Sequence, residues 1–521
     1  KHLNEYYNSE LMLRKLRISV SIIFFTLITL YFLDFRELLP DGFQFLAKIQ
    51  FLPALLALNL ILLASLVLLT FVFGRVYCSS ICPMGVYQDI VAWVSKKVKR
   101  KRKKRYSYSP AKTILRWTTL TLVVIGFLFG FTFLIGLLDP YGAYGRIVTH
   151  LFRPAYLAGN NLLESIFTQF NNYTFFRVGI HMLSVASIAI ALITLAGIGF
   201  FAWRNGRTYC NTLCPVGTVL GSISRFSLYK VQFDNEKCNS CGLCAMRCKA
   251  ACINSKELIV DYSRCINCFN CVEACRRDAM HYKPIWSKQS SVKEVPVAVG
   301  INQSKRRFLS STFTTGMAAT SLLAQATTGI SLKRELKRQQ PIAPPGVQND
   351  DRLLQKCISC HLCVTKCPSH VIKPALFEYG PGGIMQPKLY FDHGFCSYDC
   401  TVCGDVCPTG AILPLTKEEK HHTQMGQVNF ILENCIVYYD ETSCGACSEH
   451  CPTQAVSMIT YKGSLTIPHI EPSICVGCGG CEYVCPAIPF KAIYVEGLKE
   501  QQIIELEHEE QVKHVIDDFG F

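Results

Sequence analysis

The feature that most constrains this chain is the cysteine spacing between residues 357 and 485. This stretch contains four groups of four cysteines, and every group ends in a Cys-Pro pair. In chain order, groups one to four are Cys357, Cys360, Cys363, Cys367; Cys396, Cys400, Cys403, Cys407; Cys435, Cys444, Cys447, Cys451; and Cys475, Cys478, Cys481, Cys485. Groups one and four have the spacing C-x2-C-x2-C-x3-C-P, the ligand pattern of bacterial [4Fe–4S] clusters. We therefore predict four such clusters here.

Two other cysteine chemistries fit this spacing less well. Disulfide frameworks are typical of small secreted domains, whereas this chain has 521 residues and 29 cysteines in rhythmic groups. Zinc sites usually come as paired C-x2-C units, without the closing Cys-Pro.

The sequence does not establish which of the four groups exchange their last cysteines. Three closely spaced thiolates hold one cube, and the cysteine of the Cys-Pro pair usually serves the neighbouring cube. The simplest pairing joins group one with two and group three with four. A nested alternative joins one with four and two with three.

A second cysteine-rich segment lies at about residues 233–282. It contains quartet A and quartet B, both with the spacing C-x2-C-x2-C-x3-C, but followed by Lys249 and Arg276 instead of proline. The two quartets are Cys238, Cys241, Cys244, Cys248 and Cys265, Cys268, Cys271, Cys275. Cross-pairing predicts that Cys275 joins the first three ligands of A and Cys248 those of B. Cys252 is left over, and we interpret it as a small buried residue.

Four apolar stretches near the N-terminus have about the ~20 residues that a helix needs to cross a bilayer. They are roughly 18–35, 52–74, 115–138 and 178–203. Nine of the ten residues from Lys96 to Arg105 are basic, and they account for part of the net charge of +15. Since basic loops stay in the cytoplasm, we expect the N-terminus, this loop and the region after the fourth stretch to be cytoplasmic, and no nucleic acid as a partner.

A repeated motif, G-R-x-Y-C-x3-C-P-x-G, follows the second and fourth apolar stretches at residues 74–85 and 206–217. The repeat predicts two helical hairpins related by pseudo-symmetry, which would bring four thiols together. They belong to Cys78, Cys82, Cys210 and Cys214. One interpretation is a shared metal or iron–sulfur site, a second is two redox dithiols, and a third is two structural helix ends. The six quartets, these four thiols and Cys252 account for every cysteine.

A weakly apolar segment, 304–332, begins with Ser-Lys-Arg-Arg-Phe-Leu, which is similar to a twin-arginine export signal. Iron–sulfur proteins are assembled in the cytoplasm, so a domain with four clusters must cross the membrane already folded. We expect this segment to remain as a fifth span.

The predicted fold is therefore multi-domain, with an α-helical membrane domain and α+β ferredoxin-like domains on both sides of a bacterial inner membrane. The expected parts are a four-span membrane domain (1–232), a cytoplasmic two-cluster domain (233–285), a linker (286–303), a signal anchor (304–332), a second linker (333–350) and a periplasmic four-cluster domain (351–521).

The first 285 residues resemble the NapH-type membrane ferredoxins, a group that includes NosR and CcoG, through the repeated motif and the double quartet. The region after residue 304 resembles the NapG/MauM-type periplasmic polyferredoxins. These resemblances imply a quinol dehydrogenase-type electron-transfer subunit with six [4Fe–4S] clusters. They imply lipid, quinone, other membrane subunits and a periplasmic c-type cytochrome or reductase as partners. A metal-reducing or assembly factor of the CcoG kind and a redox sensor are the alternatives.

Three residues are candidates for quinone or proton chemistry. Asp139 could accept a quinol proton or cap a turn, and His150 and His181 could bind quinone or haem, although a lone histidine is more often structural. No C-x-x-C-H motif is present, so we expect no c-type haem on this chain. No ligand set in the sequence explains how electrons would cross the ~30 Å hydrocarbon core.

Overall fold

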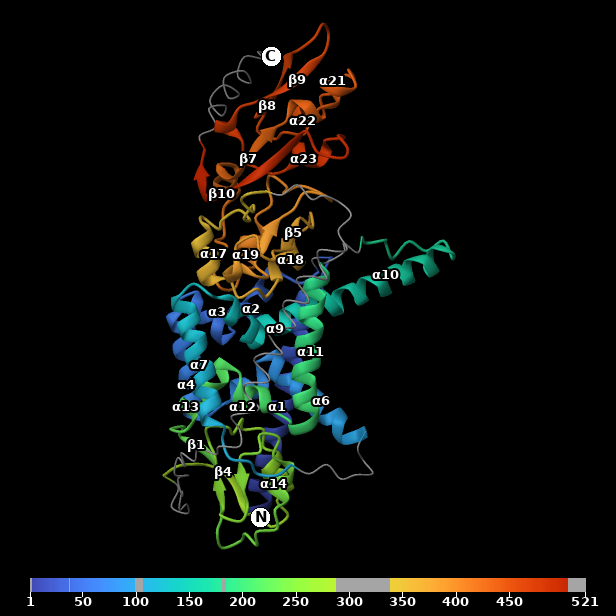
Figure 1. The fold of residues 1–521 in the computed structure, drawn as a ribbon. Helices are drawn as coiled ribbons and strands as arrows, with labels where there is room; N and C mark the ends of the chain where they lie inside the picture. The colour runs from blue at the N-terminus through green and yellow to red at the C-terminus, as the bar shows by residue number, and fades with distance from the viewer. Residues whose placement is uncertain (1, 37, 99–105, 180–183, 287–337, 505–521) are drawn as a thin grey trace, which may run out of the picture. The chain divides into compact units, whose positions relative to one another are not determined.

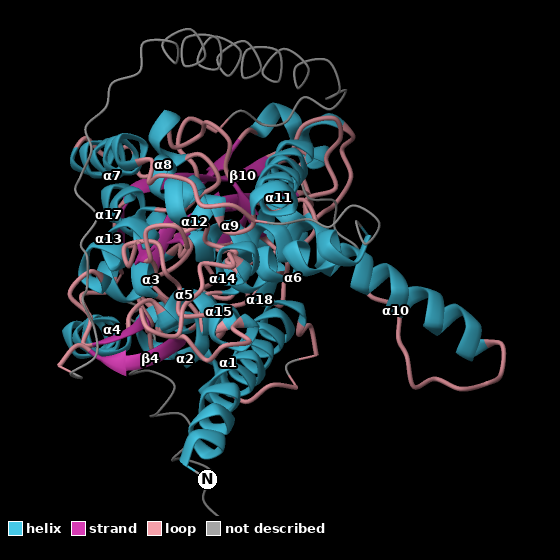
Figure 2. Ribbon diagram, turned by 90° about the horizontal axis from the view of Figure 1, so that it is seen from below, coloured by secondary structure: helices cyan, strands magenta, loops and turns pink. Residues whose placement is uncertain are grey.

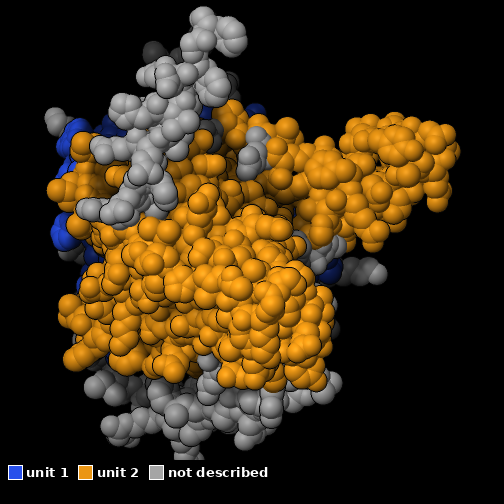
Figure 3. Space-filling model, turned by 90° about the horizontal axis from the view of Figure 1, so that it is seen from above, with its two compact units in different colours: residues 1–25, 64–120, 184–337 blue, residues 26–63, 121–183, 338–521 orange. Residues whose placement is uncertain are grey.

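The computed structural model describes residues 2–36, 38–98, 106–179, 184–286 and 338–504 (Figure 1). Most of the regular structure in these ranges is helical, with short pairs of strands (Figure 2). Two compact units are formed: unit 1 comprises residues 1–25, 64–120 and 184–337, and unit 2 comprises residues 26–63, 121–183 and 338–521 (Figure 3). The predicted membrane domain contributes to both units. The predicted signal anchor, His181 and all of the first linker except residue 286 lie outside the described residues.

The apolar stretches form helices, but two of them are interrupted. The first stretch lies in α1 (His2–Leu33) and the fourth in α11 (Val185–Asn205). The second is divided into α3 (Phe51–Leu56) and α4 (Leu60–Phe73), and the third into α7 (Thr113–Leu128) and α8 (Phe133–Leu138). Within the described ranges, only Met12–Leu33 and Val185–Asn205 are long and apolar enough to cross a membrane as single helices. The expected four uninterrupted spans are therefore reduced to two.

Both interruptions have a local backbone cause. Leu58 adopts a positive φ of 55°, and the Asn59 side chain then caps α4 by accepting from the Leu62 amide. Gly130, with a φ of 77°, ends α7, and the Phe131 amide donates back to the Gly126 carbonyl. A left-handed residue stops a helix because the next amide can no longer reach the carbonyl four residues back.

The remaining helices outside the cysteine-rich segments have 4 to 16 residues. In unit 1 they are α5 (Val76–Ser80), α6 (Pro83–Val98), α12 (Thr208–Thr212) and α13 (Pro215–Ser224). In unit 2 they are η1 (Asp41–Gln44), α2 (Phe45–Lys48), α9 (Pro140–Ile147), the π-helical turn η2 (Val148–Phe152) and α10 (Arg153–Thr168).

The double-quartet segment of unit 1 is a small α+β module. Strands β1 (Tyr229–Phe233) and β4 (Met280–Pro284) pair antiparallel with Val231 opposite Tyr282, and β2 (Ile253–Asn254) pairs with β3 (Ile259–Val260). Helices α14 (Leu243–Arg247) and α15 (Asn270–Ala274) carry the cysteines at the third positions of quartets A and B. Its core combines apolar side chains of the strands with the cysteines themselves.

In the four-group segment of unit 2, the part with groups three and four repeats this plan, because one strand pair encloses a second, whereas the part with groups one and two has a single strand pair. Its strands are β5 (Ile372–Pro374) with β6 (Pro387–Leu389), β7 (Thr423–Phe430) with β10 (Ile493–Ile503), and β8 (Val456–Thr460) with β9 (Thr466–Ile470), all antiparallel. Its helices are α17 (Asp350–Lys356), α18 (Leu362–Lys366), α19 (Val402–Asp405), α20 (Lys417–His421), α21 (Ile436–Tyr439), α22 (Ala446–Glu449) and α23 (Gly480–Val484), with 3-10 turns η4 (Pro381–Gly383), η5 (Leu432–Asn434) and η6 (Pro472–Ile474).

Candidate metal centres

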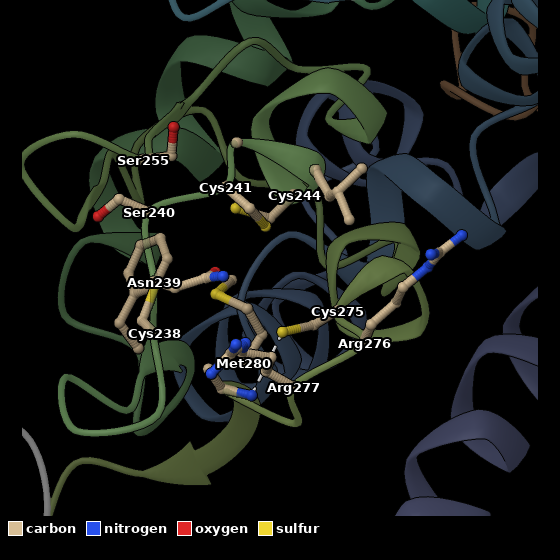
Figure 4. Close-up of a pocket in the computed structure, with 14 residues that line it drawn as sticks. Cys238, Asn239, Ser240, Cys241, Cys244, Ser255, Cys275, Arg276, Arg277 and Met280 are labelled. Atoms are coloured by element: carbon tan, nitrogen blue, oxygen red, sulfur yellow. Dashed lines mark hydrogen bonds between the residues drawn. The ribbon is translucent and has the colours of Figure 1, made fainter.

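The first three cysteines of quartet A converge with the last cysteine of quartet B. Together they line one cavity, in which the four thiols approach one another: Cys238, Cys241, Cys244 and Cys275 (Figure 4). The Ala279 amide donates to Cys275 Sγ at 3.2 Å. This is the cross-paired arrangement expected from the spacing, and Cys275 directly follows the short helix α15.

A second cavity in the same module gathers the complementary set and one more thiol. It is lined by Cys248, Cys252, Cys265, Cys268 and Cys271. Cys252 is buried, and its Sγ lies 3.4 Å from Cys248 Sγ. Sequence reasoning treats Cys252 as a structural residue, whereas the structure places it beside a candidate ligand. Its position four residues after Cys248 is the only sequence signal that could have indicated this.

Groups one and two of unit 2 exchange their last cysteines in the same way. Cys407 acts electrostatically on the thiols of group one, and Cys367 on those of group two. The two resulting sets are Cys357, Cys360, Cys363, Cys407 and Cys396, Cys400, Cys403, Cys367. Lys420 Nζ lies 3.6 Å from Cys396 Sγ, so a buried cation accompanies the second set.

Groups three and four form the other exchanged pair. A cavity is lined by Cys435, Cys444, Cys447 and Cys485, and Cys451 interacts with the first three cysteines of group four. The amide of Cys396 donates to the carbonyl of Cys478 at 2.9 Å, which joins the set containing group two to the set containing group four. The geometry therefore favours the simple pairing over the nested one.

Four of the loops share a backbone pattern that explains how they wrap. In each C-x2-C-x2-C loop, the residues two and four positions after the first cysteine have a positive φ. They are Ser240 and Gly242, Asn267 and Phe269, Ser359 and His361, and Gly477 and Gly479. Left-handed residues turn successive backbone amides to one side, which makes a concavity suited to an anionic cluster. In group one the Ser359 amide donates to Cys357 Sγ at 3.4 Å.

The two repeated motifs have the same backbone conformation. Gly74 and Gly206 have φ values of 74° and 78°, and each is followed by an arginine and a short helix. In both copies the amide of the second cysteine donates to the tyrosine carbonyl, at 3.1 Å for Cys82 and 3.0 Å for Cys214. This agreement supports the pseudo-symmetry expected from the sequence.

The four motif cysteines are buried in unit 1, and their thiols interact with one another across the two copies. Gln88 Nε2 donates to Cys210 Sγ at 3.0 Å, and the Gly217 amide donates to Cys214 Sγ at 3.2 Å. Burial, and then the neighbouring Cys210, raises the pKa of Cys82 and Cys214 well above the usual value. These thiols would therefore stay protonated unless a metal centre bound them.

Asp139 caps a helix, as one of its two sequence interpretations expects. Its carboxylate accepts from the Gly142 amide at 2.5 Å at the start of α9, and the residue is buried. Burial raises the pKa of Asp139 to about 7. A capping role does not prevent proton exchange, because a carboxyl with this pKa is half protonated near neutral pH.

His150 is held by a second histidine that sequence reasoning missed. His150 Nε2 lies 2.6 Å from His361 Nδ1, and His361 Nε2 lies 2.8 Å from the Met385 carbonyl. Burial lowers the pKa of His150 to about 3, so the ring is neutral. Since a carbonyl only accepts, His361 carries its proton on Nε2 and His150 donates to it. His150 Nδ1 then has a free lone pair and no partner in the described ranges.

Across the described residues, no group of three or more His, Cys, Asp or Glu side chains is tight enough to hold a single metal ion. This applies to the quartets and to the four motif cysteines alike. A cube fits such wider sets, because each of its irons takes one thiolate.

The comparisons with known proteins agree with this chemistry. A family model described as a 4Fe-4S binding domain matches residues 55–103 and 186–233, which contain the two repeated motifs. Models described as 4Fe-4S dicluster domains match residues 356–411 and 442–488, and residues 261–371. No solved structure matches the chain.

Three relatives are similar over part of the chain. The ferredoxin-type protein NapF of Escherichia coli (strain K12) is 25% identical over 167 residues, which are 32% of this chain and 93% of NapF. YccM of the same strain is 25% identical over 226 residues, 43% of this chain and 55% of YccM. The methylamine utilization ferredoxin-type protein MauM of Methylophilus methylotrophus is 28% identical over 204 residues, 37% of this chain and 88% of MauM.

The convergent quartets, the two kinds of cluster-binding family model and these relatives lead to one conclusion. The chain is a multi-cluster [4Fe–4S] electron-transfer protein of the ferredoxin type, distantly related to NapF, YccM and MauM.

Proposed function

We propose that this protein is a membrane-bound, quinol dehydrogenase-like subunit with six [4Fe–4S] clusters at the six quartet sets. It passes electrons between the quinone pool and a periplasmic oxidoreductase or c-type cytochrome. The observation that carries the proposal is the packing of α9 on the loop of group one, because it brings the candidate proton-accepting residues to a candidate cluster within unit 2.

The contact between α9 and this loop is close and depends on glycine. A Cβ on Gly142 would lie 2.8 Å from the Ile358 carbonyl oxygen, and one on Gly145 would lie 2.4 Å from that of Cys360. Arg146 Nη1 donates to the Ser359 carbonyl at 3.1 Å. A helix that bears Asp139 at its N-cap thus lies directly on the backbone that wraps a cluster.

A proton acceptor and a hydrogen-bond acceptor lie at this place. Asp139 has a pKa near neutrality, and His150 presents a free Nδ1. Oxidation of a quinol releases two electrons and two protons. In our proposal the electrons enter the group one cluster singly. Asp139 accepts the two protons one at a time and releases each to water, whereas the neutral His150 only accepts a hydrogen bond from the quinol hydroxyl at Nδ1. Oxidation on the periplasmic side would also remove the need for electrons to cross the hydrocarbon core.

From group one, the proposed path runs through the cysteine sets in the order of their contacts. The set of group one adjoins that of group two, since Cys363 and Cys403 interact. The Cys396–Cys478 hydrogen bond leads to the set of group four, and α23 joins that set to the last one through Cys481 and Cys485. Backbone contacts between successive sets keep such a relay short.

Membrane attachment is supported by the apolar helices. Only 28% of the apolar window of α1 and 22% of that of α11 is buried within the protein. Their exposed side chains include Ile22, Ile23 and Ile193, and the shorter α4 and α7 expose Ile61, Leu68 and Ile125. An apolar surface of this kind is characteristic of contact with lipid. Our proposal also includes the kinship with the NapH-type proteins and the location of the four-group segment in the periplasm.

The test is quinol-driven reduction of the purified, anaerobic protein, followed by EPR. We expect a quinol analogue to reduce at least one cluster, and Asp139→Asn to slow that reduction by about tenfold or more, within the range of general acid–base effects. The matched control is Asp351→Asn, which removes an exposed carboxylate in the same unit.

Dithionite separates a chemical defect from a folding defect, because it reduces every intact cluster without quinol. The absence of any quinol-dependent signal from wild-type protein that dithionite reduces fully would refute the quinone reaction. It would leave the electron-transfer assignment intact.

A further inference from the structure

The two repeated motifs contribute to each other's surroundings through their arginines. Arg75 Nη2 donates to the Cys210 carbonyl at 3.2 Å, and Arg207 Nη1 donates to the Cys78 carbonyl at 2.7 Å. The same guanidinium nitrogens lie 3.7 Å from Cys78 Sγ and 4.0 Å from Cys210 Sγ, respectively. Each arginine therefore spans from its own motif to the other, beside the thiols.

The glycine at the end of each motif makes room for the opposite arginine. A Cβ on Gly85 would lie 2.3 Å from the Cys78 carbonyl oxygen and 2.6 Å from Arg207. A Cβ on Gly217 would lie 2.2 Å from the Cys210 carbonyl oxygen and 2.9 Å from Arg75. In each copy of the motif, the final glycine thus leaves space for the arginine of the other copy, which lies beside the thiols.

The charges around the four thiols do not balance within the protein. Asp89 pairs with Arg207 at 2.8 Å, with Arg17 at 3.1 Å and with Lys249 at 3.3 Å. Arg75 is fully buried, and no carboxylate in the described ranges forms an ion pair with it. Its Nε has no hydrogen-bond partner there either. Two buried arginines and one partly buried lysine therefore share one carboxylate, an arrangement that is costly unless a further negative charge is present.

We propose that Cys78, Cys82, Cys210 and Cys214 together hold one additional [4Fe–4S] cluster, shared by the two repeats, with Arg75 and Arg207 as its charge partners. Four thiolates around a cube carry a net negative charge, which one-electron reduction increases. The cube supplies the anion that the buried arginines lack. A single metal ion fits less well, because the described side chains make no group tight enough to hold one.

The site also adjoins the cluster set of quartet B within unit 1. Arg75 Nη1 donates to the Ser263 carbonyl at 3.1 Å, two residues before Cys265, and the Arg207 amide donates to the carbonyl of Lys249 at 3.0 Å. Lys249 follows Cys248 directly. We assign the additional cluster the role of exchanging one electron at a time with the quartet B cluster. This role rests on the proposed function, whereas the binding of the cluster does not.

The first experiment counts iron and acid-labile sulfide in the full-length, anaerobically purified protein. Seven cubes correspond to about 28 irons per chain and six to about 24, with cubane Mössbauer signatures throughout. We expect the larger number for the wild type. We expect Cys82→Ser/Cys214→Ser to lose about four irons. The control Ser80→Ala, a buried residue of the same motif, should retain them. A wild type with about 24 irons would overturn the proposal, as would a folded double variant with unchanged iron and spectra.

The second experiment tests the arginine without removing a ligand. A positive charge beside a cluster favours its reduced, more negative state. Arg75→Gln should therefore keep the iron content and shift the midpoint potential of one cluster to a more negative value in an EPR-monitored titration. Arg225→Gln, which removes an exposed arginine at the end of α13, should leave all potentials unchanged. Identical titrations for the two variants would exclude Arg75 as a charge partner.

Discussion

At the scale of single residues, Cys252 shows most clearly that the role of a side chain depends on its neighbours in the folded protein. It is buried with four candidate ligands in one cavity, and its Sγ is 3.4 Å from that of Cys248. A cluster can accept a nearby thiolate in place of a lost ligand. We predict that Cys248→Ala retains its [4Fe–4S] cluster through Cys252.

This prediction is checked by iron content and EPR of dithionite-reduced protein. Cys248→Ala/Cys252→Ala should lose the cluster, and Cys252→Ala alone should keep it. Loss of the cluster in the single Cys248→Ala variant would show that Cys252 cannot reach the iron.

A second prediction at this scale concerns Asp139, because substitutions can separate its helix-capping hydrogen bond from its charge. Asparagine is as good an N-cap as aspartate, whereas alanine removes the hydrogen bond to Gly142. We expect Asp139→Ala to lower the free energy of unfolding by about 1 kcal/mol. Asp139→Asn should keep this contribution. Denaturant titration in detergent at a fixed pH measures both.

The pH dependence of stability should identify the same carboxyl. Its folded pKa of about 7 is raised above the ordinary value of 3.8, so the folded state binds a proton more tightly than the unfolded state. The resulting stabilisation is complete below about pH 4 and is lost as the pH rises through 7. In Asp139→Asn this part of the decline should disappear. Equal slopes in wild type and variant would contradict the raised pKa.

At the scale of elements, α9 shows why a helix can require glycine in its interior. A Cβ on Gly145 would meet the Cys360 carbonyl oxygen at 2.4 Å, whereas one on Gly159 in α10 would meet nothing within 4 Å. We predict that Gly145→Ala destabilises unit 2 by about 1–3 kcal/mol through overpacking. Cluster loss on oxygen exposure should become faster. Gly159→Ala should be neutral or stabilising by about 0.5–1 kcal/mol.

Absorbance at the cluster bands, followed during denaturation and oxygen exposure, compares these two variants directly. Equal behaviour of Gly145→Ala and Gly159→Ala would mean that α9 does not hold the loop of group one.

The apolar helices also show what periodicity and length can predict. Most of the described residues in the four apolar stretches are helical. The interruptions at Leu58 and Gly130 were not predicted. Hydropathy measures the side chains, whereas a helix ends through backbone conformation, and a positive φ at a leucine has no clear signature in sequence.

At the scale of the whole molecule, the proposed topology makes a prediction about access. In inverted inner-membrane vesicles, whose cytoplasmic face is turned outward, added protease should digest the double-quartet segment and leave residues 357–521 protected. Spheroplasts should show the opposite pattern. Epitope tags after Trp286 and after Phe521 allow both fragments to be followed by immunoblot, and alkaline carbonate should leave the full chain with the membrane. Digestion of both fragments from one side would contradict the proposal.

The cysteine spacing alone is enough to predict the ligand chemistry, because it reflects how far a short loop can reach around a cube. It correctly indicated the exchange of last cysteines between quartets A and B and the likeness of the two repeated motifs. The choice of the simple over the nested pairing of groups one to four depends on the fold, since both pairings use the same residues. The fold also reveals the His150–His361 pair, the thiol contact of Cys252 and the cations that share Asp89. These features join residues far apart in the chain or depend on local conformation. Their contribution to the free energy depends on burial, which cannot be derived from spacing along the sequence.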